Sequence, residues 1–300
     1  MYARAAGQCH DFPFRNSLVA VKMNRRHLGL AVGVLAALAM ADASAQRAFR
    51  QYPPLEGAES ASVLPPDYQK PAEFVFGRLM YPSTGLFAGS RSADWKEGFA
   101  PWTIDYPLGD RNFARLMRRL TTVNVRSVEQ PVDLDDGDDV FNWPFLYMDT
   151  PGSANMTDAQ IAKLREYLLR GGFLLCDSFF GTDEWNSFET HTLRRLFPDR
   201  TVVELPPDHP IFHTVYDLND RVQVRNMRSM RSRGVGYRSD GDVPHWRGVL
   251  DDDGHVMIAI MWNHDLGDAW QYADIPEYPQ SDTNFALRMG VNIAIYDLTH

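Results

Sequence analysis

The stretch FLYMDTPGSANMTDAQIAKLREYLLRGGFLLCDS, residues 145–178, decides the fold. Its first and last segments, residues 145–148 and 173–176, are short apolar runs typical of buried strands. Between them, residues 157–160 form a capping box in which Thr157 and Gln160 each satisfy a backbone donor at the start of a helix. Strand, short helix and strand make a βαβ unit, which requires parallel strands and a right-handed crossover. We therefore predict an α/β fold on a mainly parallel sheet.

Further elements extend outward from this unit. We predict strands at residues 74–81, 122–128 and 201–205, helices at 110–120 with Asp110 as the N-cap, at 185–197 and at 282–296, and an antiparallel hairpin of residues 246–250 and 255–262. The Asp253-Gly254 pair suits the positive φ angles of the hairpin turn. Residues 206–245 show no regular pattern. Together these elements predict a single α/β domain over residues 73–300, with helices on both faces of the sheet.

The N-terminal segment, residues 1–45, has the features of an export signal. Arg25-Arg26 precedes a short apolar run at residues 29–40, and Ala43-Ser44-Ala45 is a small-residue cleavage site. The paired arginines suit either a twin-arginine or a Sec signal, and translation starts at Met1 or Met23. Cleavage near Ala45 predicts a periplasmic or extracellular protein with no transmembrane helix in the mature chain, and residues 46–72 are predicted to form a proline-rich linker or arm.

Charge and cysteine content argue against a nucleic-acid partner and against disulfide stabilisation. The chain has 39 acidic and 30 basic residues, and residues 1–45 hold two of the acids and five of the bases, so the mature part is strongly acidic. Such a surface repels phosphate backbones, and we expect no nucleic-acid partner. The mature chain contains one cysteine, Cys176, which excludes an internal disulfide.

The candidate site follows from where the parallel strands end. Ligands bind beyond the carboxyl ends of the strands in open α/β sheets, so the residues after each strand are the informative ones. We single out as possible acid–base groups Asp149, Asp177, His264 and Asp265. Further ligand-binding candidates are Asp105, Tyr106, Ser178, Asn263, Asp268 and Trp270. The alternative is structural, because an aspartate after a strand often caps the next helix or closes a turn.

The sequence identifies no metal ligands and no cofactor. His209 and His213 have the spacing of a helical zinc pair, but Pro210 breaks the helix that this spacing requires. The acidic run at residues 133–139 lacks the ligand positions of a calcium loop and is predicted to be a solvated turn.

Several of these segments together resemble the bacterial domain of unknown function 4159 family. They are Tyr147-Met-Asp149, residues 171–177, Asp208-His-Pro-Ile-Phe212, residues 263–270 and the C-terminal segment 290–300. The resemblance implies a flavodoxin-like sheet akin to class I glutamine amidotransferases, and it implies no activity. Amidotransferase chemistry itself is excluded, because Cys176 lies within an apolar run instead of an exposed elbow and the chain contains no His-x-Glu pair. We predict that Cys176 is a buried core residue.

Two functional hypotheses remain. The first is a periplasmic module without turnover, whose polar edge binds a small polar molecule, a carbohydrate or a loop of an envelope protein. The second is a hydrolase-like enzyme that uses the Asp and His candidates, with a divalent cation as its one optional cofactor.

Overall fold

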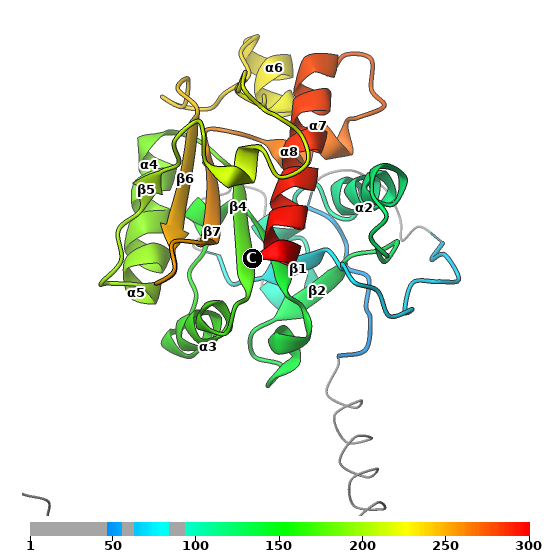
Figure 1. The fold of residues 1–300 in the computed structure, drawn as a ribbon, viewed down its shortest axis with the longest axis vertical. Helices are drawn as coiled ribbons and strands as arrows, with labels where there is room; N and C mark the ends of the chain where they lie inside the picture. Colours follow the sequence, from blue (N-terminus) through cyan, green and yellow to red (C-terminus); the bar gives the residue numbers. More distant parts are fainter. Residues whose placement is uncertain (1–46, 56–62, 84–93) are drawn as a thin grey trace, which may run out of the picture. The chain divides into compact units, whose positions relative to one another are not determined.

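One sheet organises the chain, and its strands are the short apolar runs of the sequence (Figure 1). The computed structural model describes residues 47–55, 63–83 and 94–300. Within them, seven strands lie in the order β2-β1-β3-β4-β7-β6-β5. They are β1 (Gly77–Met80), β2 (Gln130–Asp133), β3 (Phe145–Asp149), β4 (Phe173–Phe179), β5 (Val203–Glu204), β6 (His245–Leu250) and β7 (Val256–Trp262). The predicted export signal lies outside the described residues.

Most of the sheet is parallel. Strands β2, β1, β3, β4 and β7 pair in parallel, while β6 is antiparallel to β7 and β5 is antiparallel to β6. The predicted α/β fold, with a mainly parallel sheet and an antiparallel hairpin near the C-terminus, is confirmed.

Helices cover both faces of the sheet, as Figure 1 shows. They are α2 (Leu108–Leu120), α3 (Asp158–Leu169), α4 (Gly181–Phe188), α5 (Arg194–Leu196), α6 (Met227–Arg233), α7 (Leu266–Gln271) and α8 (Gln280–Thr299). Successive strand residues point to opposite faces, so Leu146 packs in the core that includes α3 and Tyr147 in the core that includes α2, α7 and α8. Cys176 is buried in the first of these cores, as predicted.

The βαβ unit forms as the sequence indicates. β3 and β4 pair in parallel with Phe145 opposite Phe173 and Asp149 opposite Asp177. The capping box is complete, since the Gln160 amide donates to Thr157 Oγ1 at 3.2 Å and the Thr157 amide to Gln160 Oε1 at 3.0 Å. The connection between the two strands is therefore set locally by sequence.

Two predicted elements near α2 are wrong in detail. The strand expected at residues 122–128 is a loop that pairs with Phe74 just before β1, through a bridge at Val125 and backbone hydrogen bonds of Asn124 and Arg126, and β2 begins at Gln130. Arg126 explains this, because its guanidinium donates to the carbonyls of Val128 and Glu129 and fixes a turn there. Asp110 lies inside α2 and is not its N-cap.

Other boundaries shift because local periodicity is interrupted. The helix predicted at residues 185–197 begins at Gly181 and contains a π-helical turn at Glu189–Leu193. The segment 206–245 contains α6, which the sequence did not indicate, and a short 3₁₀ helix at Pro210–Phe212. The predicted hairpin forms between β6 and β7.

The segment before β1 contacts the domain. Tyr52 is buried, and its amide donates to the Tyr106 hydroxyl at 3.2 Å. The acidic run at residues 133–139 is not a fully solvated turn, because Asp133 and Asp139 are buried and Arg47 and Lys96 form ion pairs with the run. No helix among the described residues is long and apolar enough to cross a membrane.

Candidate functional site

Carboxylates from three separate parts of the chain meet at the carboxyl edge of the parallel sheet. Asp149 is the last residue of β3, Asp177 lies near the end of β4, and Asp265 caps α7 directly after β7. Asp149 and Asp177 are opposite one another in the sheet register. All three side chains are buried. The convergence predicted from parallel strands is therefore observed.

The tightest group consists of Asp105, Asp265 and Asp268. One carboxylate oxygen from each lies within 4.8 Å of the other two. Asp105, a predicted ligand-binding candidate, comes from the loop before α2, and it is 2% exposed. Neither of its carboxylate oxygens has a hydrogen-bond partner. A buried, unpartnered carboxylate is costly in free energy, so the Asp105 carboxylate is expected to bind a proton or a cation.

The other two carboxylates of the group are held in fixed positions. Asp265 Oδ1 accepts hydrogen bonds from Ser178 Oγ at 2.9 Å and from the Asp268 amide at 3.0 Å. Asn226 Nδ2 donates to Asp265 Oδ2 at 2.8 Å and to Asp268 Oδ2 at 3.0 Å, so one amide group joins both carboxylates. The Met227 amide completes the set by donating to Asp268.

Asp177 lies next to this group and contacts the start of α7. Its Oδ2 accepts from the Tyr147 hydroxyl and from the Gly267 amide, both at 3.0 Å, while Oδ1 is buried without a partner. Gly267 also allows the Asp105 carboxylate to lie close to the start of α7, because a Cβ at this position would lie 2.3 Å from Asp105 Oδ2. Only glycine therefore permits the observed position of Asp105.

Asp149 already has hydrogen-bond partners for both carboxylate oxygens. Arg78, which is 1% exposed, donates to Asp149 Oδ2 at 3.2 Å and to Asp110 Oδ2 at 2.8 Å. Thr150 Oγ1 donates to the remaining Asp149 oxygen at 2.7 Å. Asp149 is thus paired and rigid, in contrast to Asp105.

The electrostatics reflect this crowding. Burial, followed by the charges of Asp268 and Asp265, raises the pKa of Asp105 well above its usual value. Burial and the neighbouring Asp265 raise the pKa of Asp177 to about 7. Like charges in a site of low dielectric disfavour ionisation, and a bound cation reverses that effect.

Backbone strain concentrates at the same edge. Positive φ angles occur at Asp105 (59°), Thr150 (44°), Ser178 (62°) and Asn263 (66°), none of which is a glycine. Ser178 lies where the β4–β7 register shifts, which turns its side chain toward Asp265. Such conformations persist where surrounding contacts impose them, and they cluster at functional sites.

A pocket of about 230 Å³ opens above these carboxylates. Asp265, Asp268 and Ser178 line one side, and α6 with the segment after it lines the other. The arginines of that second wall, Arg228, Arg233 and Arg238, were missed at the sequence level. Their signal in the sequence is the arginine-rich run of residues 225–238, within a segment that shows no regular pattern.

Seven of the ten predicted candidates are absent from the pocket lining, and four of these make structural contacts away from the carboxylate cluster. The His264 ring stacks near Trp246 and accepts from the Val224 amide, and burial lowers its pKa to about 3. Trp270 is 1% exposed and packs in the core on Phe113. The other two hold backbone: the Tyr106 hydroxyl accepts from Tyr52, and Asn263 bonds Gly181 and Val243.

The two spaced histidines make local contacts. His209 Nδ1 accepts from the Ile211 amide, and His213 pairs with Asp217. These contacts belong to a 3₁₀ turn, as the proline between the histidines indicated.

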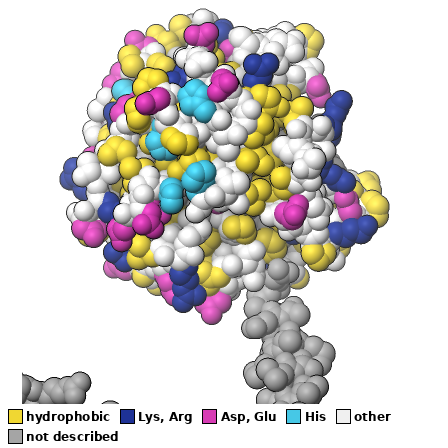
Figure 2. Space-filling model, in the orientation of Figure 1, with side chains coloured by type: hydrophobic (Ala, Val, Ile, Leu, Met, Phe, Trp, Pro, Cys, Tyr) yellow, Lys and Arg dark blue, Asp and Glu magenta, His cyan; other side chains and the backbone are white. Residues whose placement is uncertain are grey.

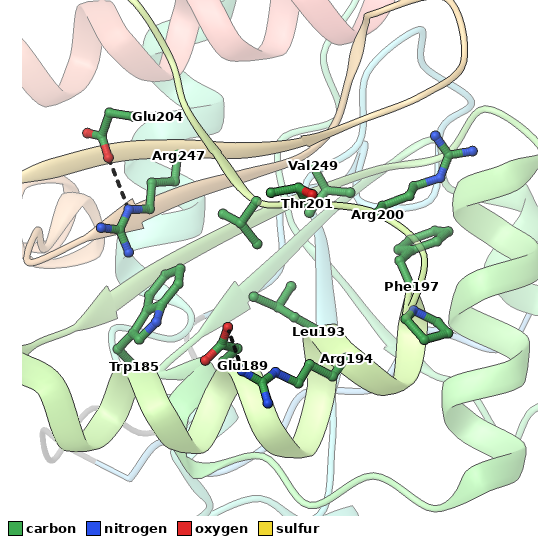
Figure 3. Close-up of a pocket in the computed structure, with 12 residues that line it drawn as sticks. Trp185, Glu189, Leu193, Arg194, Phe197, Arg200, Thr201, Glu204, Arg247 and Val249 are labelled. Atoms are coloured by element: carbon green, nitrogen blue, oxygen red, sulfur yellow. Dashed lines mark hydrogen bonds and ion pairs between the residues drawn. The ribbon is translucent and has the colours of Figure 1, made fainter.

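A larger cavity of about 610 Å³ lies elsewhere, between the α4–α5 segment and the strands β5 and β6 (Figure 3). Arg247 stacks over the rings of Trp185 and Trp262 there and pairs with Glu204. This cavity is open, and none of the clustered aspartates described above lines it. Size alone does not make it the candidate site.

Fold and site together define an α/β domain with a polar pocket at the carboxyl edge of a parallel sheet. No curated protein matches the chain. The chain belongs to the family described as Domain of unknown function (DUF4159), whose model matches residues 93–298. The matched residues include every carboxylate of the site described above.

Proposed function

We propose that this protein is an exported binding module that holds a hard divalent cation, Mg²⁺ or Ca²⁺, beneath a small polar pocket. One observation carries the proposal: Asp105 is buried with both carboxylate oxygens unpartnered, and it shares a 4.8 Å cluster with Asp265 and Asp268. An all-oxygen set of carboxylates is the donor type that these cations prefer.

The surrounding contacts favour a cation over a structural role for Asp105. A structural aspartate normally accepts hydrogen bonds from backbone or side-chain donors, as Asp149 does here. Asn226 fixes one oxygen of Asp265 and one of Asp268, so the cluster needs little rearrangement to bind an ion. Preorganised ligands of this kind bind without a large ordering cost.

The test is thermal unfolding of the metal-stripped chain with Mg²⁺, Ca²⁺ or Mn²⁺. At a concentration about 100 times Kd, binding adds about 2.7 kcal/mol, which raises Tm by about 5–10 °C for a domain of this size. Asp105→Asn is expected to abolish the shift. Asp297→Asn is the matched control, because Asp297 also has a buried unpartnered oxygen but lines a different cavity.

Two results would refute the cation site. One is that none of the three cations stabilises the wild-type protein. The other is that Asp105→Asn responds to cations as the wild type and Asp297→Asn do.

A hydrolase is the second candidate, and Ser178 favours it. Its strained backbone directs the hydroxyl toward Asp265, and both residues line the pocket. His264 takes no part in this version, because its ring lies against Trp246. Hydrolysis of p-nitrophenyl acetate or p-nitrophenyl phosphate with Mg²⁺, lost in Ser178→Ala, would support an enzyme; absence of turnover supports a binding module.

Export is proposed from the sequence of residues 1–45. A reporter joined after Gln46 is expected in the periplasm. Changing Arg25-Arg26 to Lys-Lys distinguishes the twin-arginine route from the Sec route. Loss of export would assign the twin-arginine route, and retention would assign Sec. Kinship with class I glutamine amidotransferases is proposed for the fold alone, since Cys176 is buried.

A further inference from the structure

We propose that the pocket above the carboxylates binds the anionic oxygen group of a small ligand, a phosphoryl or carboxylate group, between the cation and the arginines of the α6 wall. The proposal rests on the cation site proposed above and names the class of ligand that this site takes. The two walls of the pocket, described next, carry it.

The pocket has walls of opposite charge. Asp265 and Asp268 line the side next to the cation cluster, while Arg228 and Arg233 of α6 line the other side. Arg238, after α6, also lines the pocket, but its Nη2 donates to the Ser178 carbonyl at 3.0 Å and to Glu184 Oε2 at 3.1 Å, so its charge is already paired and the α6 arginines carry the argument. An isolated cation needs only the carboxylates. A basic wall facing them points to a ligand that carries negative charge.

Metal and arginine chemistry agree on the same type of ligand. Mg²⁺ commonly binds one or two protein carboxylates together with the phosphate oxygens of a substrate. Guanidinium groups match phosphoryl and carboxylate oxygens in a bidentate geometry. The mature chain repels anions as a whole, so binding an anion here requires these local positive charges. On the face shown in Figure 2, acidic and basic side chains are interspersed, with no extended basic surface.

The position of α6 is tied to the cation cluster. Asn226, its N-cap, donates to both Asp265 and Asp268, and the Met227 amide donates to Asp268. The arginines are therefore held at a fixed place relative to the carboxylates. The seven-residue helix α6 is thus positioned by the same carboxylates that form the cation cluster.

Pocket size limits the ligand. The volume of about 230 Å³ is below the range of about 300–1,000 Å³ usual for drug-sized ligands. Ser229 adds a hydroxyl group to the lining, which suits a further oxygen atom of the ligand, while the Ser232 hydroxyl donates to the Arg228 carbonyl. A phosphate or carboxylate group with a few attached atoms fits this space.

Calorimetric titration of the full chain tests the inference, with inorganic phosphate and malonate as separate probes. At saturating Mg²⁺ we expect one of the two to bind, and its Kd to weaken at least tenfold when Mg²⁺ is removed. The probe that binds more tightly distinguishes a phosphoryl from a carboxylate ligand. Arg233→Gln should weaken anion binding at least tenfold while the Kd for Mg²⁺ alone stays unchanged.

Arg231→Gln is the matched control, since Arg231 is an exposed arginine of the same helix that is absent from the lining of this pocket, lies in the adjoining one and has its guanidinium over the Tyr272 ring. It should bind the anion as the wild type does. If Mg²⁺ binds but neither anion does, or if Arg231→Gln and Arg233→Gln behave alike, the inference is overturned and the cation site stands. If Mg²⁺ itself does not bind, the proposed function fails first.

Discussion

Gly267 is the position where one added methyl group tests the geometry of the cation cluster. Its Cβ would lie 2.3 Å from Asp105 Oδ2 and 2.8 Å from the Tyr147 hydroxyl. Carbon and oxygen do not approach this closely, so in Gly267→Ala the Asp105 carboxylate must move by about 1 Å to reach ordinary contact at about 3.5 Å. Asp105 has little room to move, because it is buried and its backbone is strained.

The expected magnitude separates stability from binding. Gly267 lies in α7, where alanine gains about 1 kcal/mol of helix propensity, while overpacking costs about 1–3 kcal/mol. The metal-free protein should therefore lose no more than about 2 kcal/mol of unfolding free energy. Displacing a cation ligand, in contrast, should weaken cation binding by about 10–100-fold, as disturbing the surroundings of a metal ligand typically does.

Isothermal titration with Mg²⁺ or Mn²⁺ measures the change, with urea unfolding as the companion assay. Gly109→Ala is the matched control, because Gly109 lies in α2 beside the same loop and its added Cβ would come no closer than 3.3 Å to any atom. An unchanged Kd in Gly267→Ala would refute the placement of the cation next to Asp105. Equal losses in both variants would show that strain between the helices, and not the ligand, was measured.

Two further predictions concern buried charge outside the proposed cation ligands. Burial raises the pKa of Asp297 to about 7, so the folded state binds a proton more tightly than the unfolded state and stability falls as pH rises from about 4 to about 7. In urea unfolding, Asp297→Asn should therefore stabilise the protein by up to about 4 kcal/mol at pH 8 and hardly at pH 4. An equal effect at both pH values would contradict this. Arg78→Met leaves Asp110 and Asp149 buried without their cation and should cost about 3–5 kcal/mol in the same assay; a loss below about 1 kcal/mol would show that the pair is not needed.

Local signals in the sequence were sufficient for the elements around the site. The capping box at Thr157 and the apolar runs of β3 and β4 specify a βαβ unit, and parallel strands place Asp149 and Asp177 at one edge. The same logic located Asp265 after β7 and indicated that the Asp105 loop belongs with it. These predictions depended on strand direction, which short sequence patterns determine well.

Side-chain direction and long-range contacts could not be predicted in this way. His264 and Asp265 are adjacent in sequence but point to different surroundings, one to Trp246 and the other to the pocket. α6 has too few residues for a periodic pattern, and Asn226 at its start is held by carboxylates far along the chain. Tertiary contacts of this type leave no signal in local sequence.

Anomalous scattering from a crystal of the chain grown with Mn²⁺ tests the central claim most directly. Mn²⁺ accepts the same oxygen ligands as Mg²⁺ and is visible in such data. We predict one strong peak among Asp105, Asp265 and Asp268, with metal–oxygen distances of about 2.0–2.4 Å, and no peak there in Asp105→Asn. A crystal with Mn²⁺ bound only elsewhere, or with those three carboxylates still unoccupied, would contradict the account.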